Sequence, residues 1–192
     1  GVDFEDILLW NCRGDLRLAD TDQARLRKTA VEGCTTIMAP ATPNRAAIIA
    51  HNEDGAAAFS QHRYWLRARP ELGPSFESYL YPGMLPGHSF AVTGAGLVQT
   101  INNIRPDDLR PGVPRHVICR AVLGSETLDD ALGHLKRTDR ASGFHHALAR
   151  AGENRVLSVE APASTCIVRE LNTPQAHANH LIDPETQTIG QT

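Results

Sequence analysis

One pair of helical segments lies between two stretches of short strand-like runs, and this order restricts the fold more than any other feature of the chain. The strand-like runs fall within about 33–103 and 155–181, and the helical pair falls within about 114–137. Turn residues separate the short runs. Sheets covered by helices accommodate such an order, so the sequence predicts an α+β fold.

In the first half, a strand is predicted at residues 4–10 and a short helix from Asp20 to Gly33. The runs CTTIMA and RAAIIAHN, joined by the turn PATPN, predict a hairpin. Residues 70–88 contain four prolines and are expected to form an irregular surface segment. The run SFAVTGAGLVQTINNI predicts a second strand pair that turns at Gly94–Gly96.

In the second half, Pro114 suits the first turn of a helix that runs to about Leu123. The segment TLDD is a weak capping box and predicts a second helix from Thr127 to about Arg137. The runs RVLSVEA, STCIVRE and QAHANHL are predicted to be strands.

Composition argues against several classes of function. With 192 residues and 41% hydrophobic content the chain can bury a core, and its net charge of −3 comes from interleaved acids and bases. This pattern indicates neither a nucleic-acid nor a membrane partner. No apolar run approaches the roughly 20 residues of a membrane span, and the N-terminus lacks a signal-peptide pattern. The sequence therefore predicts a cytoplasmic protein that acts on a small molecule.

Cys34 follows Gly33 at a predicted boundary between helix and strand. A lone cysteine is usually a small buried hydrophobe, and the four cysteines here form no C-x-x-C pair. However, Gly33 leaves the carbonyl beside the thiol unobstructed and permits backbone angles closed to other residues. If this bond were cut, Cys34 would gain an α-amine of pKa about 7.7–8.0, a base beside its own thiol. That chemistry predicts self-processing followed by amide or ester chemistry.

Four segments resemble, in order and spacing, the acyl-coenzyme A:6-aminopenicillanic acid acyltransferase family of N-terminal nucleophile hydrolases. They are EGCTTIMAP, IIAHNEDG, the run from Ser89 to Leu123, and AHANHL. The resemblance covers about Phe4 to Ile182. It implies a single domain over residues 1–192 with an αββα sandwich that is incomplete in this chain.

The resemblance also implies an activity. The Cys34 thiol would attack the Gly33 carbonyl, and water would open the resulting thioester, leaving an α piece (1–33) and a β piece (34–192). The β piece would cleave a small N-acyl amide or acyl thioester through an acyl-cysteine intermediate. The acyl group would pass to water or to an amine. No cofactor or metal is expected.

Further site residues are carried over from the family. Asp54, in the Asn-x-Asp core that begins at Asn52, would orient the free α-amine, although Asp-Gly after a strand is also a common turn. Asn179 matches the asparagine that stabilises the oxyanion. Asn102 or Asn103 would do so from the other side, although an Asn-Asn pair also suits a turn or a strand end.

His51 stands where many relatives carry Arg and the penicillin acyltransferase carries Gln. With Asn52 it is assigned to substrate binding, and its identity leaves the substrate open, from acylated β-lactam nuclei to β-alanyl amines. Relatives also continue past the strand that carries Asn179 and have more chain before the nucleophile. A sandwich without those strands has open edges. We therefore expect a homo-oligomer or an additional chain to complete it.

Other histidine and glycine patterns carry alternative interpretations. TGAGLVQ has Gln99 at the third glycine position of a nucleotide fingerprint and no helix after it, which argues against nucleotide binding. His177 and His180 would serve a zinc hydrolase, but on a strand their offset sends them to opposite faces. His145 and His146 are expected at a solvated or partly packed strand end.

Two interpretations remain open at this stage. Arg105, Arg110 and Arg115 lie in a charged segment that is either a solvated loop or part of a pocket that recognises a substrate carboxylate. The alternative to an enzyme is a binding or structural protein of the same fold that never processes itself, with Cys34 merely packed.

Overall fold

The structure, a computed structural model, describes residues 1–16 and 33–191 of the chain. Most of the helix predicted from Asp20 to Gly33 lies outside these residues. The elements in chain order are α1 (Phe4–Cys12), β1 (Gly33–Ala39), β2 (Ile48–Asp54), the 3-10 helix η2 (Ala57–Phe59), β3 (Tyr64–Ala68), β4 (Phe76–Leu80), β5 (Phe90–Thr93), β6 (Leu97–Asn102), α3 (Arg115–Val122), α4 (Leu128–Leu135), β7 (His145–Arg150), β8 (Val156–Glu160), β9 (Ile167–Glu170) and β10 (Gln175–His177).

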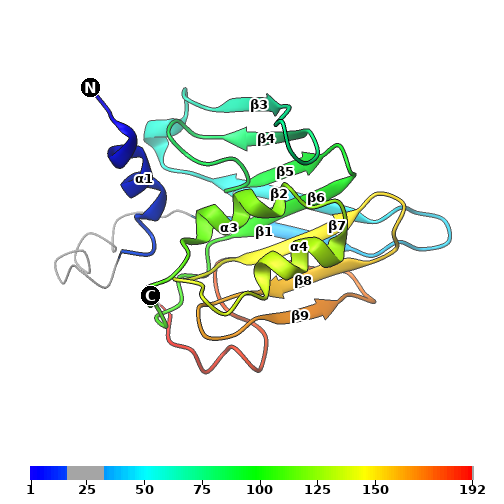
Figure 1. Cartoon of the computed structure of the whole chain (residues 1–192). Coiled ribbons are helices and arrows are strands. Elements are labelled where there is room, and N and C mark those ends of the chain that lie inside the picture. Colours follow the sequence, from blue (N-terminus) through cyan, green and yellow to red (C-terminus); the bar gives the residue numbers. More distant parts are fainter. Residues whose placement is uncertain (17–32, 192) are drawn as a thin grey trace.

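The described residues form three layers (Figure 1). A three-stranded antiparallel sheet, β10-β1-β2, packs on a seven-stranded antiparallel sheet, β3-β4-β5-β6-β7-β8-β9. Helices α3 and α4 cover the opposite face of the larger sheet. The predicted α+β class is therefore confirmed, with three layers of the αββα sandwich present in the described residues.

Several predicted elements are confirmed. β1 and β2 form the expected hairpin, and β5 and β6 form the second strand pair. Gly96 has a φ of 80°, a left-handed angle that glycine adopts without strain, which explains the turn between β5 and β6. Thr127 caps α4, and its side chain and that of Asp130 satisfy each other's backbone amides in a capping box.

The prediction of a strand at residues 4–10 is wrong, because α1 occupies this segment. The carboxylate of Asp3 accepts a hydrogen bond from the backbone amide of Asp6, and the carboxylate of Asp6 accepts one from the amide of Asp3. This capping box satisfies amides that the first helical turn would otherwise leave unpaired. A short apolar run fits either helix or strand, and here the cap favours the helix.

The prediction of an irregular surface segment at 70–88 is also wrong in part. β4 lies within it and pairs with β3 on one side and β5 on the other. Phe76, at the start of β4, is buried in a small cluster with Ala91 and Leu123. Pro74 and Pro82 lie on either side of the strand and do not interrupt its hydrogen bonding.

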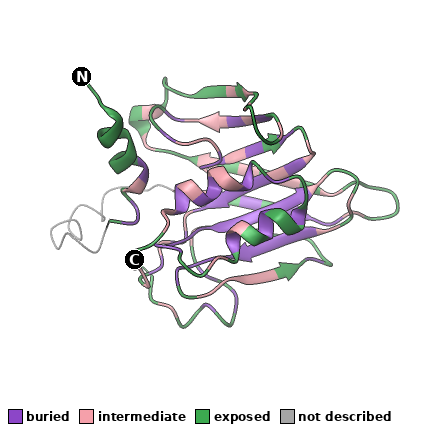
Figure 2. Cartoon of the chain, viewed as in Figure 1, coloured by how far each residue is buried: buried purple, intermediate pink, exposed green. Residues whose placement is uncertain are grey.

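The main apolar core lies between the helices and the larger sheet (Figure 2). Leu148 and Leu157 of the sheet contact this core, and α3 and α4 contribute residues such as Val122 and Leu132. A second, smaller cluster lies between the two sheets around Met38 of β1. Burying this apolar area is the main force that holds the layers together.

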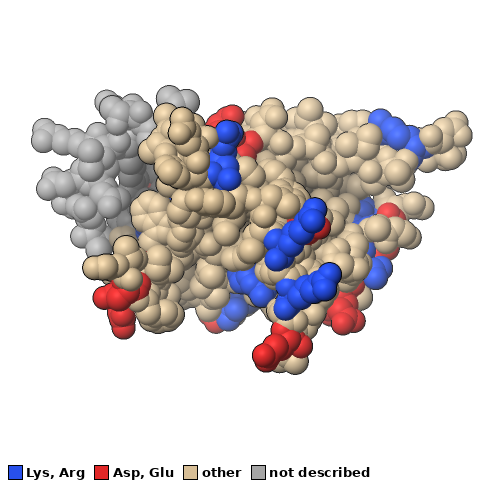
Figure 3. Space-filling view, turned by 90° about the horizontal axis from the view of Figure 1, so that it is seen from above, with Lys and Arg blue, Asp and Glu red and all other residues tan. Residues whose placement is uncertain are grey.

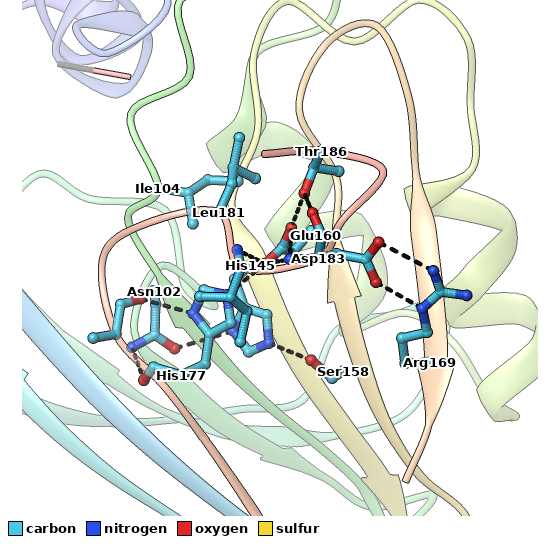
Figure 4. A network of polar contacts seen from close by, with 12 residues as sticks. Asn102, Ile104, His145, Ser158, Glu160, Arg169, His177, Leu181, Asp183 and Thr186 are labelled. Atoms are coloured by element: carbon cyan, nitrogen blue, oxygen red, sulfur yellow. Dashed lines mark hydrogen bonds and ion pairs between the residues drawn. The ribbon is translucent and has the colours of Figure 1, made fainter. Parts of the chain in front are cut away.

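Toward the other end of the two sheets, their interface is polar (Figure 4). His145 of β7 stacks on His177 of β10, with ring centroids 3.5 Å apart. His145 also contacts Asn102 Oδ1 at 3.2 Å and Ser158 Oγ at 2.9 Å. His177 Nε2 lies 2.9 Å from the carboxylate of Glu160. We use the name inter-sheet polar layer for the set His145, His177, Asn102, Ser158, Glu160, Thr36 and Thr100.

The two histidine expectations are wrong at least in part. His145 and His146 do lie at a strand end, since they begin β7, but both are buried and are neither solvated nor partly packed. His177 and His180 do not lie on opposite faces of a strand, because β10 ends at His177. His180 is exposed, and its ring centroid lies 6.4 Å from that of His177.

The outer face of the smaller sheet is exposed. Ile37 and Ile48 have 52% and 45% of their surface accessible. Among the described residues, no helix covers this face (Figure 1). The expectation that a partner chain or further polypeptide completes the sandwich stays a prediction.

We predict that the free energy of unfolding falls as the pH drops from about 6.5 to 4.5. Burial lowers the pKa of His145 and of His116 well below the ordinary value, and lowers that of His146 to about 3. As the pH falls below about 6.5, these histidines therefore bind protons in the unfolded chain but not in the folded chain. Each histidine lowers the free energy of unfolding by up to about 1.4 kcal/mol per pH unit. Denaturant unfolding at a series of pH values measures this.

A matched pair of variants isolates the cause. His146→Leu removes one buried histidine whose Nδ1 has no hydrogen-bond partner and should flatten the slope. His62→Ala, at an exposed position, should leave the slope unchanged. A wild-type free energy that stays level over this pH range contradicts the prediction.

Candidate active site

Strand pairing places Cys34 beside Glu53. In the antiparallel pair of β1 and β2, Cys34 is opposite Glu53 and Thr36 is opposite His51. Residues opposite each other project on the same face, as do residues two apart on one strand. The four side chains therefore share the face toward the larger sheet, where Thr36 is fully buried and the other three are half-buried.

Three polar groups meet at Oε2 of Glu53. Cys34 Sγ lies 3.5 Å from this oxygen and His51 Nε2 lies 3.2 Å from it. Ser89 is the residue before β5, and its Oγ donates a hydrogen bond of 2.5 Å to the same oxygen. The carboxylate is thus held in one position by groups from two sheets.

His51 is fixed from its other side. Its Nδ1 lies 2.8 Å from Thr36 Oγ1, and Thr36 donates to Asn102 Oδ1, also at 2.8 Å. Because a hydroxyl group has one hydrogen, His51 Nδ1 supplies the hydrogen in its contact with Thr36. His51 Nε2 therefore faces Glu53, and the inter-sheet polar layer sets the orientation of the ring.

Burial and charge keep the Cys34 thiol protonated in the uncut chain. Burial is the largest cause, the carboxylate of Glu53 adds to it, and together they raise the pKa of Cys34 to about 12 against the opposing hydrogen bond of the Asp54 backbone. Burial acts to raise the pKa of Glu53 as well. Hydrogen bonds from His51 and Ser89 outweigh that effect, so the pKa of Glu53 lies below its ordinary value.

Asn179 contacts the bond proposed for cleavage. Its Oδ1 accepts a hydrogen bond of 2.7 Å from the backbone amide of Cys34, and its Nδ2 donates to the carbonyl of Asn103 at 3.1 Å. Asn179 lies two residues after β10, which pairs with β1. Asn179 thus lies next to Asn103, and the assignment of these asparagines to the oxyanion stays a prediction.

The two adjacent asparagines lie in different environments. Asn103 lines the cavity described below, and its Oδ1 accepts a hydrogen bond of 2.9 Å from Arg115 Nη1. Asn102 is fully buried in the inter-sheet polar layer, where its Nδ2 donates to the carbonyl of His177 at 3.3 Å. Only Asn103 of the pair thus faces the cavity.

Gly33 has a steric role at this point. A Cβ atom at this position would lie 3.0 Å from Asn179 Oδ1 and 3.7 Å from Asp54 Oδ2. A glycine at this position therefore leaves space next to the Asn179 side chain. Asp54 is exposed at the end of β2, directly opposite Gly33.

A cavity of about 260 Å³ opens in front of Cys34. One wall is aromatic and apolar, with Phe59, Tyr81, Met84 and Phe144. Phe59 and Tyr81 stack with ring centroids 4.7 Å apart. The other lining residues include Gly33, Glu53, Asp54, Asn103 and Asn179.

Other predicted site residues lie elsewhere. Neither His51 nor Asn52 is among the residues that line the cavity, since His51 lies beneath Glu53 and Asn52 is on the exposed outer face of β2. Their assignment to substrate binding stays a prediction. Arg105 and Arg115 line the cavity, whereas Arg110 is bound to the carbonyl groups of Thr138, Arg140 and Ala163 and does not.

A set of metal-type donors is present, but not the one considered from the sequence. Within the described ranges, Cys34, His51 and Glu53 form the group whose donor atoms all lie within 4.8 Å of one another. His177 and His180 do not belong to it, because the ring of His177 is engaged by the Ala178 carbonyl and Glu160. All four cysteines of the chain are free thiols.

Sequence reasoning missed Glu53, Ser89 and Thr36. Glu53 is the middle residue of the Asn-x-Asp core, where only the flanking positions were considered. The signal that was available is its two-residue spacing from His51, which puts both on one face of a strand. The part played by Ser89 depends on how the two sheets pack and has no local signal.

Comparisons with known proteins show the family of the chain. Residues 41–192 match the family described as acyl-coenzyme A:6-aminopenicillanic acid acyl-transferase. The match begins after Cys34 and so leaves the role of that residue untested. A beta-alanyl-dopamine/carcinine hydrolase of Drosophila melanogaster is 32% identical over 146 residues, which is 70% of this chain and 37% of the relative. The chain thus spans little more than a third of that relative.

A solved structure shares the fold. It is the Caenorhabditis elegans ortholog of N-acylethanolamine-hydrolyzing acid amidase, with a TM-score of 0.57 and 16% identity over 81% of this chain and 73% of that chain. This similarity confirms the N-terminal nucleophile hydrolase type of sandwich. No described helix is long and apolar enough to cross a membrane. The chain belongs to the acyl-coenzyme A:6-aminopenicillanic acid acyltransferase family, a family of acyltransferases and amide hydrolases.

Proposed function

We propose that the chain is a self-processing cysteine amidohydrolase or acyltransferase with Cys34 as its nucleophile. One observation carries the proposal. The Cys34 thiol opens on the cavity and contacts Glu53, while the amide of the same residue is held by Asn179. A nucleophile, a carboxylate and an asparagine thus surround the bond between Gly33 and Cys34.

Before the cut, the nitrogen of Cys34 is an amide and cannot serve as a base. Glu53 Oε2, 3.5 Å from Sγ, is the group placed to accept the thiol proton. The sulfur then attacks the carbonyl carbon of Gly33, and the proton passes to the departing nitrogen as the C–N bond breaks. Water opens the thioester, its hydroxyl joining Gly33 and its hydrogen returning to sulfur.

After the cut, the new α-amine of Cys34 takes over as the base. Asp54, opposite Gly33 in the strand pair, is the carboxylate that would orient this amine. The thiolate attacks the carbonyl of a bound substrate, and Asn179 and Asn103, which line the same cavity as Cys34, are candidate donors to the oxyanion. Turning the Asn179 amide toward the substrate becomes possible once the Gly33 peptide is gone.

The cavity suits a small acyl compound. Its aromatic and apolar wall fits an acyl or aryl group, and its volume of about 260 Å³ admits only a small ligand. The similar Drosophila protein is named for hydrolysis of beta-alanyl-dopamine and carcinine, and the similar solved structure for N-acylethanolamine hydrolysis. We infer a small N-acyl amide as substrate, with water or an amine as the acceptor.

Intact-mass measurement of the purified chain should show two pieces that join at Gly33 and Cys34. Cys34→Ala should remain a single chain because it has no nucleophile. Cys166→Ser, which replaces another half-buried thiol, should be cut like the wild type. A wild-type protein that stays whole through purification and prolonged incubation rules out self-processing and favours the non-processed alternative.

Glu53→Gln should have opposite effects on two rates. Removing the carboxylate takes away the proton acceptor, so the cut should slow by at least about tenfold, as expected for a lost general base. The same change removes a negative charge that raises the pKa of Cys34, so the thiol should become easier to deprotonate and to alkylate.

Alkylation is followed with iodoacetamide on the peptide that spans Gly33 and Cys34, which only the uncut chain yields. A variant in which both rates fall would indicate a general loss of structure. A variant that is cut as fast as the wild type removes Glu53 from the mechanism.

A panel of N-acyl amides tests the second reaction. The cut protein, quenched in acid during turnover, should carry the mass of one acyl group on the piece that begins with Cys34. Addition of amines to the same assays distinguishes transfer from hydrolysis by the product formed. Turnover that leaves no acylated piece, even with slow esters or thioesters, contradicts the acyl-cysteine intermediate.

A further inference from the structure

We propose that Cys34, His51 and Glu53 form a binding site for a zinc-type divalent cation that locks the nucleophile. The three side chains offer a sulfur, an imidazole nitrogen and a carboxylate oxygen, the donors that Zn²⁺ prefers. They come from two paired strands, so their spacing is held by the β1–β2 ladder. The proposed occupant is Zn²⁺ itself.

The donor distances fit a tetrahedral ion. Bonds of about 2.0–2.3 Å from zinc to its ligands imply separations of about 3.3–3.7 Å between ligand atoms. Cys34 Sγ and Glu53 Oε2 are 3.5 Å apart, and His51 Nε2 and Glu53 Oε2 are 3.2 Å apart. Cys34 Sγ and His51 Nε2 lie within 4.8 Å of each other, so side-chain adjustments would bring all three atoms to tetrahedral spacing around Zn²⁺.

The surrounding residues are those a metal site needs. A histidine that binds a metal through one nitrogen usually donates the hydrogen of the other, which fixes the ring. His51 Nδ1 makes this contact with buried Thr36, and Thr36 is itself held by Asn102. Ser89 donates a hydrogen bond to the carboxylate of Glu53 and so fixes this ligand as well.

The charges also balance at this site. Binding replaces the hydrogen of the Cys34 thiol and the hydrogen that His51 Nε2 donates to Glu53, and both leave to solvent as a Zn–S bond and a Zn–N bond form. Two negative ligands and one neutral imidazole then neutralise the divalent ion. Cys34 and Glu53 both line the cavity, so the fourth coordination position faces it and is open to water or a ligand.

The consequence is inhibition. A sulfur bound to zinc cannot attack the Gly33 carbonyl or a substrate, so Zn²⁺ would hold the chain uncut and silence the cut enzyme. This consequence rests on the proposed function, whereas the binding itself does not. Removal of the metal by a chelator would release the nucleophile.

Binding is tested with Co²⁺ and Zn²⁺ on the full chain. One equivalent of Co²⁺ should give a thiolate-to-cobalt band in the near ultraviolet and the visible bands of tetrahedral cobalt, and Zn²⁺ should displace both. Cys34→Ser and His51→Gln should abolish the bands. Thr36→Val, which removes only the support of His51, should weaken the affinity about 10–100-fold.

Cys166→Ser and His180→Ala serve as matched controls, because each removes a donor of the same type outside the site. Both should bind like the wild type. Bands that survive in Cys34→Ser, or a wild-type chain that gives none, overturn the proposal. Circular dichroism of each variant verifies that it is folded.

A second measurement needs no variant. Zn²⁺ should protect Cys34 of the wild-type chain from iodoacetamide, while the half-buried Cys166 in the same molecule reacts at its usual rate. Protection of both thiols to the same extent, or of neither, contradicts a specific site.

The cutting assay separates the two proposals. With a chelator present the chain should process itself, and one equivalent of Zn²⁺ should stop it. If the chain binds Zn²⁺ through Cys34 but is never cut, the metal site is supported and the proposed function is refuted. If the chain is cut equally with and without Zn²⁺, inhibition by the metal is refuted and the proposed function is supported.

Discussion

The buried carboxylate of Glu160 holds together the part of the molecule on which the site depends. It accepts hydrogen bonds from His177, from the backbone amides of Ile182 and Asp183, and from the hydroxyl of Thr186 (Figure 4). Burial would raise its pKa, but these contacts outweigh burial and lower it. A buried anion with this many partners fixes their positions, because releasing any of them leaves charge unpaired in a low-dielectric interior.

This anchor holds the segment that carries Asn179, the residue that contacts the amide of the proposed scissile bond. Glu160 belongs to the larger sheet and His177 ends β10 of the smaller one, so their contact joins the sheets. Asn179 follows two residues later and reaches the amide of Cys34. On the same interface, Thr36 and Asn102 orient His51 beneath Glu53. The chemistry proposed for Cys34 thus depends on a polar interface, although an apolar core stabilises the sandwich as a whole.

Charges of both signs are present on the surface of the described residues. On the face shown in Figure 3, acidic and basic side chains lie interspersed among the described residues, in line with a net charge of −3. Arg115, which the sequence places in a charged segment, is buried against Phe144 with its guanidinium 4.2 Å from the ring centroid. Arg115 donates a hydrogen bond to Asn103 at the cavity wall. One of the two interpretations from the sequence had placed this arginine in a solvated loop.

Much of the fold could be predicted because it is local. The β1–β2 hairpin, the β5–β6 pair and the capped helix α4 follow from turn and cap residues within a few positions of each other. Residues 4–10 were misassigned because a short apolar run fits two structures. β3 was missed together with its partner β4, which lies in the proline-rich segment 70–88. Burial of His145 and His146 could not be foreseen, because it depends on strands on either side of β7.

For the site, the sequence alone determined the candidate nucleophile, its glycine, the Asn-x-Asp core and the family, since these are patterns of neighbouring residues. Only the tertiary structure decided that Glu53 contacts Cys34 and that Asn103, and not Asn102, faces the cavity. It also decided that Asn179 accepts a hydrogen bond from the Cys34 amide. That last contact joins residues 145 positions apart. Such choices depend on which face of each strand packs against the other sheet, and a single-residue change of register would reverse them.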